Sequence, residues 1–223
     1  MVGFHFLVDI DKVFRFVPGL MPKWFWFWGG SLIGSMFLFA AGAAYFIQVQ
    51  KGKTKKELAV RGLRIFALGL LLTGFSVKFV PSGPIWFGIL HCIGFSMVLG
   101  TWLSSRSLRK LLSLAVLFFI LGGVTEGFRL PTQGLVWLGV RGPVSLKMGD
   151  YFPVFPWTGM FILGIAYSHF RLSKPIAESS HLRNHSVEQG LGWLSRKSLM
   201  IYFIHQPVLI GLMYLFSLIS SRN

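Results

Sequence analysis

The chain has 223 residues, of which 53% are hydrophobic and only 13% are charged. A soluble globular domain carries about twice that charged fraction, so this composition excludes an ordinary soluble fold and predicts an all-α, polytopic transmembrane bundle. The net charge of +15 would indicate nucleic-acid binding in a soluble protein, but the basic residues gather in short loops between apolar segments. We therefore expect one domain over residues 1–223, embedded in the lipid bilayer and binding no nucleic acid.

Cysteine and histidine usage limits the metal chemistry of the chain. Cys92 is the single cysteine and lies in an apolar segment, so neither an internal disulfide nor a cysteine metal site can form within the chain. The histidines of the apolar segments fall at different depths along their predicted spans. We expect no metal site and no bound cofactor.

The apolar segments predict how often the chain crosses the membrane. Residues 1–10 are too few to span a bilayer, which takes about 20, and we interpret them as the second half of a transmembrane helix whose first half is absent. Six full spans follow, at residues 24–48, 65–80, 86–103, 111–124, 152–170 and 198–218. The loops after residues 48, 103 and 170 are the basic ones, which assigns them to the cytoplasm.

The span at 152–170 has an unusual entry. Asp150 stands before it, and Pro153, Pro156 and Trp157 follow. Proline lacks a backbone donor and suits the first turn of a helix, where that donor would be unsatisfied anyway. The pattern predicts a helix that begins at the membrane interface near Pro153 to Pro156, with Asp150 just outside it. A carboxylate at this position is costly unless water or a ligand meets it.

Ionisable residues inside spans are candidates for function. His5 and Asp9 are four residues apart, so on a helix they share one face and the carboxylate can orient the imidazole as a base or nucleophile. The alternative is a simple pair at a helix end. His91 lies in the outer part of its span, where an interhelical hydrogen bond is the alternative to ligand binding. His205 and Gln206 lie in the inner part of the last span, where Pro207 makes kink stabilisation the alternative.

Four basic residues mark predicted cytoplasmic helix ends. They are Arg61, Arg64, Arg196 and Lys197. Contact with lipid headgroups is their default role, and binding the phosphates of a nucleotide-bearing donor is the alternative.

Three segments resemble a known family. They read FGILHCIGFSMVL (residues 87–99), DYFPVFPWTGMFILGIA (150–166) and LGWLSRKSLMIYFIHQPVLIG (191–211), and the N-terminal MVGFHFLVDI adds a fourth match. They are similar to the heparan-alpha-glucosaminide N-acetyltransferase catalytic-domain family, in particular its small bacterial members within a wider membrane acyltransferase superfamily. The resemblance implies transfer of an acetyl or acyl group from acetyl-CoA, as co-substrate, to an acceptor across the membrane.

The resemblance places the catalytic histidine of the first helix at His5. Related acyltransferases carry an arginine about three helical turns earlier, a position that this chain does not contain. We expect His5 and Asp9 to be catalytic, and His91, Asp150 and Trp157 to bind the acceptor from the outer side. His205 and Gln206 are expected to contact the donor, and the four basic residues its phosphates.

Two other functions fit the same residues. A small-anion transporter or permease would line a path with them, and a non-catalytic membrane protein would use them for packing. The resemblance points to a bacterial cytoplasmic membrane. The acceptor and the oligomeric state, a homodimer included, stay open.

Overall fold

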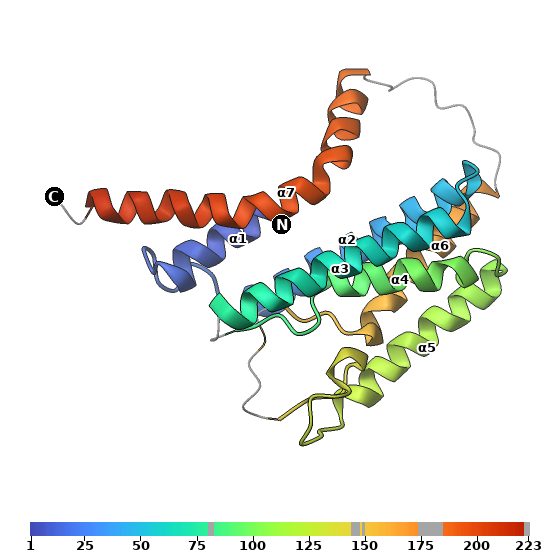
Figure 1. The fold of residues 1–223 in the computed structure, drawn as a ribbon, viewed down its shortest axis with the longest axis horizontal. Coiled ribbons are helices and arrows are strands. Elements are labelled where there is room, and N and C mark those ends of the chain that lie inside the picture. The colour runs from blue at the N-terminus through green and yellow to red at the C-terminus, as the bar shows by residue number, and fades with distance from the viewer. Residues whose placement is uncertain (80–82, 144–147, 149, 174–184, 221–223) are drawn as a thin grey trace. The chain divides into compact units, whose positions relative to one another are not determined.

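A computed structural model describes residues 1–79, 83–143, 148, 150–173 and 185–220; for residues 27, 185–196 and 220 it describes the backbone alone. The elements are α1 (Val2–Val8), the π-helix η1 (Asp9–Val13), α2 (Lys23–Gln50), α3 (Lys55–Phe79), α4 (Ile89–Leu103), α5 (Leu108–Glu126), the 3-10 helix η2 (Val136–Leu138), α6 (Val154–Leu172) and α7 (His185–Ser220) (Figure 1). Within the described ranges no strand forms beyond two isolated bridges, so the all-α prediction is confirmed.

Among the described residues, four stretches of helix are long and apolar enough to cross a membrane, at Lys23–Gln50, Lys55–Phe79, Leu108–Glu126 and Lys197–Ile219. The α4 helix is apolar but has only 15 residues. The α6 helix has 19, and its last turn carries His169 and Arg171. The predicted count of six full spans with a partial first helix therefore stays a prediction.

Two of the predicted boundaries are wrong. The sequence predicts a loop for the basic run before residue 65, but α3 already begins at Lys55. Its start is fixed by a capping box: the amide of Thr54 donates to Glu57 Oε2 at 2.8 Å, and the amide of Glu57 donates to Thr54 Oγ1 at 3.2 Å. The long polar loop predicted up to residue 197 is likewise shortened, because α7 begins at His185.

The predicted start of the helix after Asp150 is confirmed. Pro153 is the N-cap of α6, and the first helical residue is Val154. Phe155 departs from helical geometry, and the Phe155–Pro156 peptide bond is cis. The regular part of α6 therefore starts at the second proline, and Asp150 lies outside the helix as predicted.

The chain folds as two compact units. Unit 1 comprises Met1–Ile33 and Ile176–Asn223, and unit 2 comprises Gly34–Pro175. Unit 1 holds α1, η1, the start of α2 and the described part of α7. Unit 2 holds the rest of α2 and the helices α3 to α6. The prediction of one domain over residues 1–223 stays a prediction.

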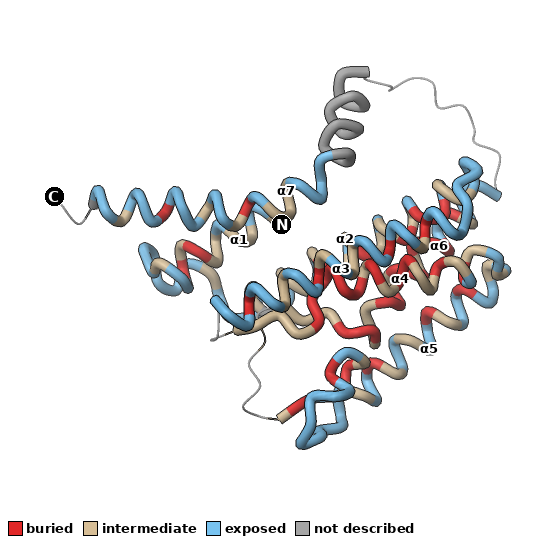
Figure 2. Tube along the Cα trace, viewed as in Figure 1, coloured by how far each residue is buried: buried red, intermediate tan, exposed pale blue. Residues whose placement is uncertain are grey.

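The core of unit 2 lies on α4 and α6, whose residues are the most buried in Figure 2, whereas α3 and α5 expose most of their residues. The backbones of α2 and α6 pack close together at two glycines. A Cβ on Gly42 of α2 would collide with the backbone of Phe161 of α6, and one on Gly164 would collide with the backbone of α2. The missing side chain of Gly42 thus lets α2 lie close to α6.

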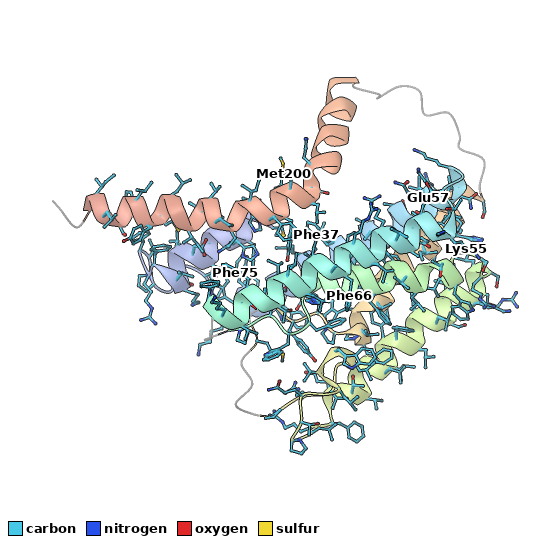
Figure 3. The ribbon with its side chains drawn as sticks, viewed as in Figure 1. Phe37, Lys55, Glu57, Phe66, Phe75 and Met200 are labelled. Carbon is cyan, nitrogen blue, oxygen red and sulfur yellow. The ribbon has the colours of Figure 1, made fainter. Side chains whose placement is uncertain are left out.

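The loops of unit 2 alternate between its two ends. The α2–α3 turn, the α4–α5 turn and the end of α6 lie together, and the loops after α3 and α5 lie at the other end (Figure 1). Lys55 and Glu57 mark the first end on α3, and Phe75 lies toward the second (Figure 3). The first end is the basic one, in agreement with the alternation that the sequence predicts.

Candidate functional site

Four polar residues meet in unit 1, where α1 and η1 contact α7. We call them the α1–α7 cluster: His5, Asp9, His205 and Gln206. The amide Nε2 of Gln206 donates to both carboxylate oxygens of Asp9, at 3.0 and 3.2 Å. The rings of His5 and His205 have centroids 5.0 Å apart. Asp9 is fully buried and His205 is 9% exposed, so the cluster is inside the unit.

The hydrogen bonds of His205 fix which ring nitrogen carries the proton. Its Nδ1 lies 3.0 Å from the carbonyl oxygen of Ile201 and 2.7 Å from that of Tyr202, one turn earlier on α7. A carbonyl oxygen only accepts, so Nδ1 is the protonated nitrogen. In the neutral ring Nε2 then carries the lone pair, which is what a base, nucleophile or acceptor needs.

Two atoms of this cluster have no hydrogen-bond partner in the described part of the chain. They are Nε2 of His205 and Oε1 of Gln206, and both are buried. A buried polar atom left unpaired costs about 1–3 kcal/mol. Such atoms in a native fold indicate a site where a ligand, substrate or water makes the missing bond.

The backbone beneath Asp9 is irregular. α1 ends at Val8, and the next five residues form the π-helix η1. π-helical turns are rare and often occur at functional sites, because the extra residue rotates the side chains that follow. Here the turn begins at the buried carboxylate itself.

Two predictions about these residues need correction. The sequence predicts that Asp9 orients His5, but within the described hydrogen bonds its side-chain partner is Gln206. It also predicts His205 at another depth from His5, on the donor side, but the two rings are neighbours. Spacing along one helix predicts the first pairing, whereas a contact between residues 200 positions apart is set by tertiary packing.

A second polar cluster lies in unit 2, at the start of α4. We call it the α4 cap: Thr73, Gly88, Ile89, His91 and Asp150. The amide of Gly88 donates to His91 Nδ1 at 3.1 Å, and His91 Nε2 lies 3.4 Å from Thr73 Oγ1. Because Nδ1 accepts, the proton of the neutral ring is on Nε2, the reverse of His205. Both nitrogens of His91 thus have partners inside the protein.

Aromatic rings and a glycine hold His91 in place. Its ring stacks on Phe87 at 5.2 Å and meets the edge of Phe66 at 5.3 Å. Gly69 of α3 lies against the ring as well, where a Cβ would come within 3.0 Å of the ring atoms. His91 is 1% exposed. Since its ring also accepts the amide of Gly88, the side chain caps the start of α4.

Asp150 meets the same helix start. Its Oδ2 accepts the amide of Ile89, the first residue of α4, at 3.0 Å. The positive end of the helix dipole and this hydrogen bond both favour the carboxylate. Burial acts against them and raises the pKa of Asp150 to about 6. The N-terminus of α4 therefore supplies the compensation that the sequence predicts this charge to need.

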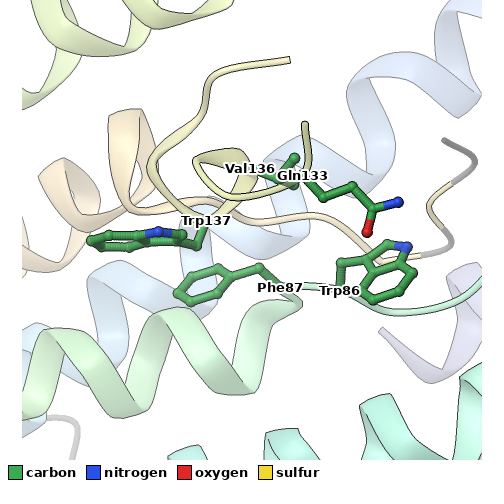
Figure 4. Close-up of a pocket in the computed structure, with 5 residues that line it drawn as sticks. All are labelled: Trp86, Phe87, Gln133, Val136 and Trp137. Carbon is green, nitrogen blue, oxygen red and sulfur yellow. The ribbon is translucent and has the colours of Figure 1, made fainter. Parts of the chain in front are cut away.

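Trp157, the third residue predicted to bind acceptor, packs inside unit 2. Its ring meets the edge of Phe152 at 4.6 Å, within the apolar cluster around Leu38, Phe87, Cys92 and Val154. A small pocket of about 150 Å³ opens nearby between Trp86, Phe87, Gln133, Val136 and Trp137 (Figure 4). Phe87 joins this pocket to the α4 cap, but no predicted site residue lines it.

The predicted phosphate-binding residues are partly described. Arg61 and Arg64 are exposed on α3, and Lys197 is exposed on α7. The side chain of Arg196 lies outside the described residues. The acceptor-binding role predicted for His91 and Asp150 stays a prediction, because they belong to unit 2 and the catalytic candidate His5 belongs to unit 1. In the described chain, no three His, Cys, Asp or Glu side chains are grouped to hold a metal ion.

The long apolar helices of the described ranges define a multi-helix integral membrane protein. The family follows from the whole sequence: the model of the family described as heparan-alpha-glucosaminide N-acetyltransferase, catalytic, matches residues 1–207, and the chain belongs to this family. No curated protein and no solved structure matches the chain.

Proposed function

We propose that the protein is an integral membrane acyltransferase of the bacterial cytoplasmic membrane. It moves an acetyl group from acetyl-CoA, bound from the cytoplasm, to a hydroxyl or amine acceptor on the outer side. Membership of the family supports acetyl transfer, and the apolar helices support the membrane location. The donor, the acceptor and the sidedness are part of the proposal.

The observation that carries it is the Nε2 of His205, which has no partner among the described residues and lies beside the ring of His5, in a cluster with the buried Asp9. Acyl transfer to a hydroxyl or amine needs a group that takes the proton of the acceptor as its oxygen or nitrogen attacks the thioester. Neutral imidazole is suited to this step because its ordinary pKa is near neutrality. The α1–α7 cluster offers two imidazoles and one fixed lone pair.

The chemistry divides between the two rings. His5 meets the acceptor and serves as general base or as transient acyl carrier, and His205 presents Nε2 beside it. The proton that leaves the acceptor returns to the thiolate of coenzyme A as the thioester C–S bond breaks. Gln206 holds the carboxylate of Asp9 in the same cluster.

The other predicted residues take supporting roles. His91, Asp150 and Trp157 hold the outer loop at the acceptor side, and His91 acts there by fixing the start of α4. Arg61, Arg64, Arg196 and Lys197 attract the phosphates of the donor. As cations they raise the local concentration of an anionic ligand without making a specific pocket.

Transfer of radiolabelled acetyl from acetyl-CoA, measured in proteoliposomes, tests the proposal. The wild type is expected to label a hydroxyl or amine acceptor from a mixed acceptor pool, and His5→Ala is expected to lose this labelling. Equal labelling by both proteins would remove His5 from the mechanism. Anion flux through the wild type without any acyl donor would favour a transporter instead.

A further inference from the structure

A second group of unpaired polar atoms lies in unit 2 and comprises residues to which no role is assigned above. In the described chain five buried side-chain atoms of unit 2 lack a hydrogen-bond partner. One is Trp86 Nε1, in the loop before α4, and the other four are Tyr45 Oη, Ser104 Oγ, Arg106 Nε and His169 Nδ1. These four belong to α2, the end of α4, the α4–α5 turn and the end of α6. The end of α2, the α4–α5 turn and the end of α6 lie together at the basic end of the unit (Figure 1).

Packing contacts place these residues around the same helix ends. A Cβ on Gly100 would lie 2.8 Å from Cζ of Tyr45, the ring carbon that bears the hydroxyl. Ser104 follows Gly100 by one helical turn, so its hydroxyl is on the same face of α4. His169 of α6 meets Phe46, the neighbour of Tyr45, with ring centroids 5.2 Å apart.

Tyr45 makes the strongest case for a missing partner. It is 2% exposed, and its ring also meets the edge of Phe161 at 5.8 Å, which fixes its direction. Buried tyrosine hydroxyls usually find a hydrogen-bond partner. A phenylalanine would fill the same apolar space without that cost, so packing alone does not explain the hydroxyl.

The surrounding charge identifies the chemical class of the partner. The basic end carries Lys51, Lys53, Lys55, Lys56, Arg106, Arg109, Lys110 and Arg171. Among the described residues at this end, the acidic one is Glu57, and its carboxylate pairs with Lys53 at 3.1 Å. Arg106 has no carboxylate partner among the described residues, and its guanidinium lies over the ring of Trp102 at 4.0 Å.

We propose that this end of unit 2 is a phosphate-binding site, formed by Tyr45, Ser104, Arg106 and His169. A phosphate group accepts several hydrogen bonds and carries negative charge, which matches two hydroxyls, a ring nitrogen and an arginine that lies over an aromatic ring. The phosphate belongs either to a nucleotide such as coenzyme A or to an anionic lipid headgroup. The site does not depend on the chemistry proposed for the α1–α7 cluster.

Thermal unfolding of the full chain in neutral phosphatidylcholine nanodiscs tests this site. One arm adds coenzyme A or 3′-phosphoadenosine 5′-phosphate, and the other replaces part of the lipid by phosphatidylglycerol. A ligand that binds the folded state raises the unfolding temperature. We expect a rise in one of the two arms, and the arm that responds identifies the source of the phosphate.

Two variants and a matched control locate the effect. Tyr45→Phe and Arg106→Gln are each expected to weaken binding by about tenfold or more, as loss of one hydrogen bond to a charged group predicts. Arg109→Gln, an exposed cation on α5, is expected to change binding by less than about threefold. Without ligand, Tyr45→Phe should unfold at the same temperature as the wild type or higher, since it removes an unpaired polar group.

The outcomes separate cleanly from those of the acyl-transfer proposal. No rise in either arm, or the same rise in Tyr45→Phe, Arg106→Gln and Arg109→Gln, would overturn the phosphate site. His5→Ala is expected to bind the responding phosphate compound as the wild type does. Loss of acetyl transfer in that variant therefore leaves the phosphate site untouched.

Discussion

The α1–α7 cluster and the α4 cap contain the same types of residue and use them differently. Each has a buried histidine and a carboxylate. In the α4 cap both nitrogens of His91 have partners, and the carboxylate of Asp150 accepts a backbone amide. In the α1–α7 cluster one nitrogen of His205 and the amide oxygen of Gln206 have none among the described residues.

The difference indicates what each region is built to do. A cluster whose polar atoms are satisfied by backbone and neighbouring side chains stabilises a joint between elements. A cluster with unpaired atoms beside a buried charge carries a free-energy cost that only a substrate, ligand or water removes. The chemistry is therefore expected in unit 1, and the α4 cap is expected to hold the loops of unit 2.

The largest expected effect is on catalysis by the histidine pair. His205→Gln keeps a polar side chain but removes the imidazole, so acetyl transfer should fall by about 10²–10⁴-fold, the usual contribution of a positioned acid–base group. Unfolding temperature should change little. Initial rates of acetyl transfer in proteoliposomes measure this. A His205→Gln variant that keeps a third of the wild-type rate would remove His205 from the chemistry.

The next effect concerns the buried carboxylate. Gln206→Leu leaves Asp9 without its hydrogen-bond partner, which should cost about 2–3 kcal/mol in the free energy of unfolding. Asp9→Leu combined with Gln206→Leu removes both polar groups and should be less destabilised than Gln206→Leu alone. Unfolding in detergent micelles gives both values. Simple additivity of the two substitutions would mean that the pair is not coupled.

His91 should affect stability more than rate. His91→Ala frees the amide of Gly88 and removes the cap of α4, for a loss of about 1–2 kcal/mol. His91→Gln restores an acceptor at the third helical position, as in a capping box, and should recover part of that loss. Acetyl transfer by either variant, measured well below its unfolding temperature, should stay within about fivefold of the wild type. A hundredfold loss with unchanged stability would make His91 part of the chemistry.

The smallest effect is the pH dependence that Asp150 contributes. Burial raises the pKa of this carboxyl to about 6 from its ordinary 3.8, so the folded protein holds the proton more tightly than the unfolded chain does. Its contribution to stability is therefore present below about pH 4 and is lost as the pH rises through about 6. Asp150→Asn should flatten unfolding temperature against pH across this window. An unchanged slope would mean that another group titrates there.

The sequence predicts much of this arrangement from local pattern. Apolar length and basic loops predict the helices and the alternation of unit 2, and two prolines predict the start of α6. The capping box at Thr54 and Glu57 is also legible as T-x-x-E and would have moved the start of α3 to Lys55. The hydrogen-bond partners of the buried polar residues cannot be predicted from local pattern, because tertiary packing determines them.

The site shows where such reasoning stops. The spacing of His5 and Asp9 predicts a pair on one face of a helix, but η1 interrupts that helix at Asp9 and Gln206 becomes the partner. The predicted depths along their spans place His5 and His205 apart, but in the structure their rings are neighbours. Tyr45, Ser104, Arg106 and His169 carry no motif. Only the structure indicates these four residues, through their buried atoms that lack a hydrogen-bond partner in the described fold.

The most direct test is the protonation state of the two buried histidines, read by nitrogen-15 magnetic resonance of the protein in lipid at neutral pH. The account predicts opposite neutral tautomers: His205 with the proton on Nδ1 and a bare Nε2, and His91 with the proton on Nε2. His5→Gln should leave the tautomer of His205 unchanged, because backbone carbonyls of α7 fix it. A proton found on Nε2 of His205, with Nδ1 bare, would contradict the central claim that this ring offers its lone pair to the reaction.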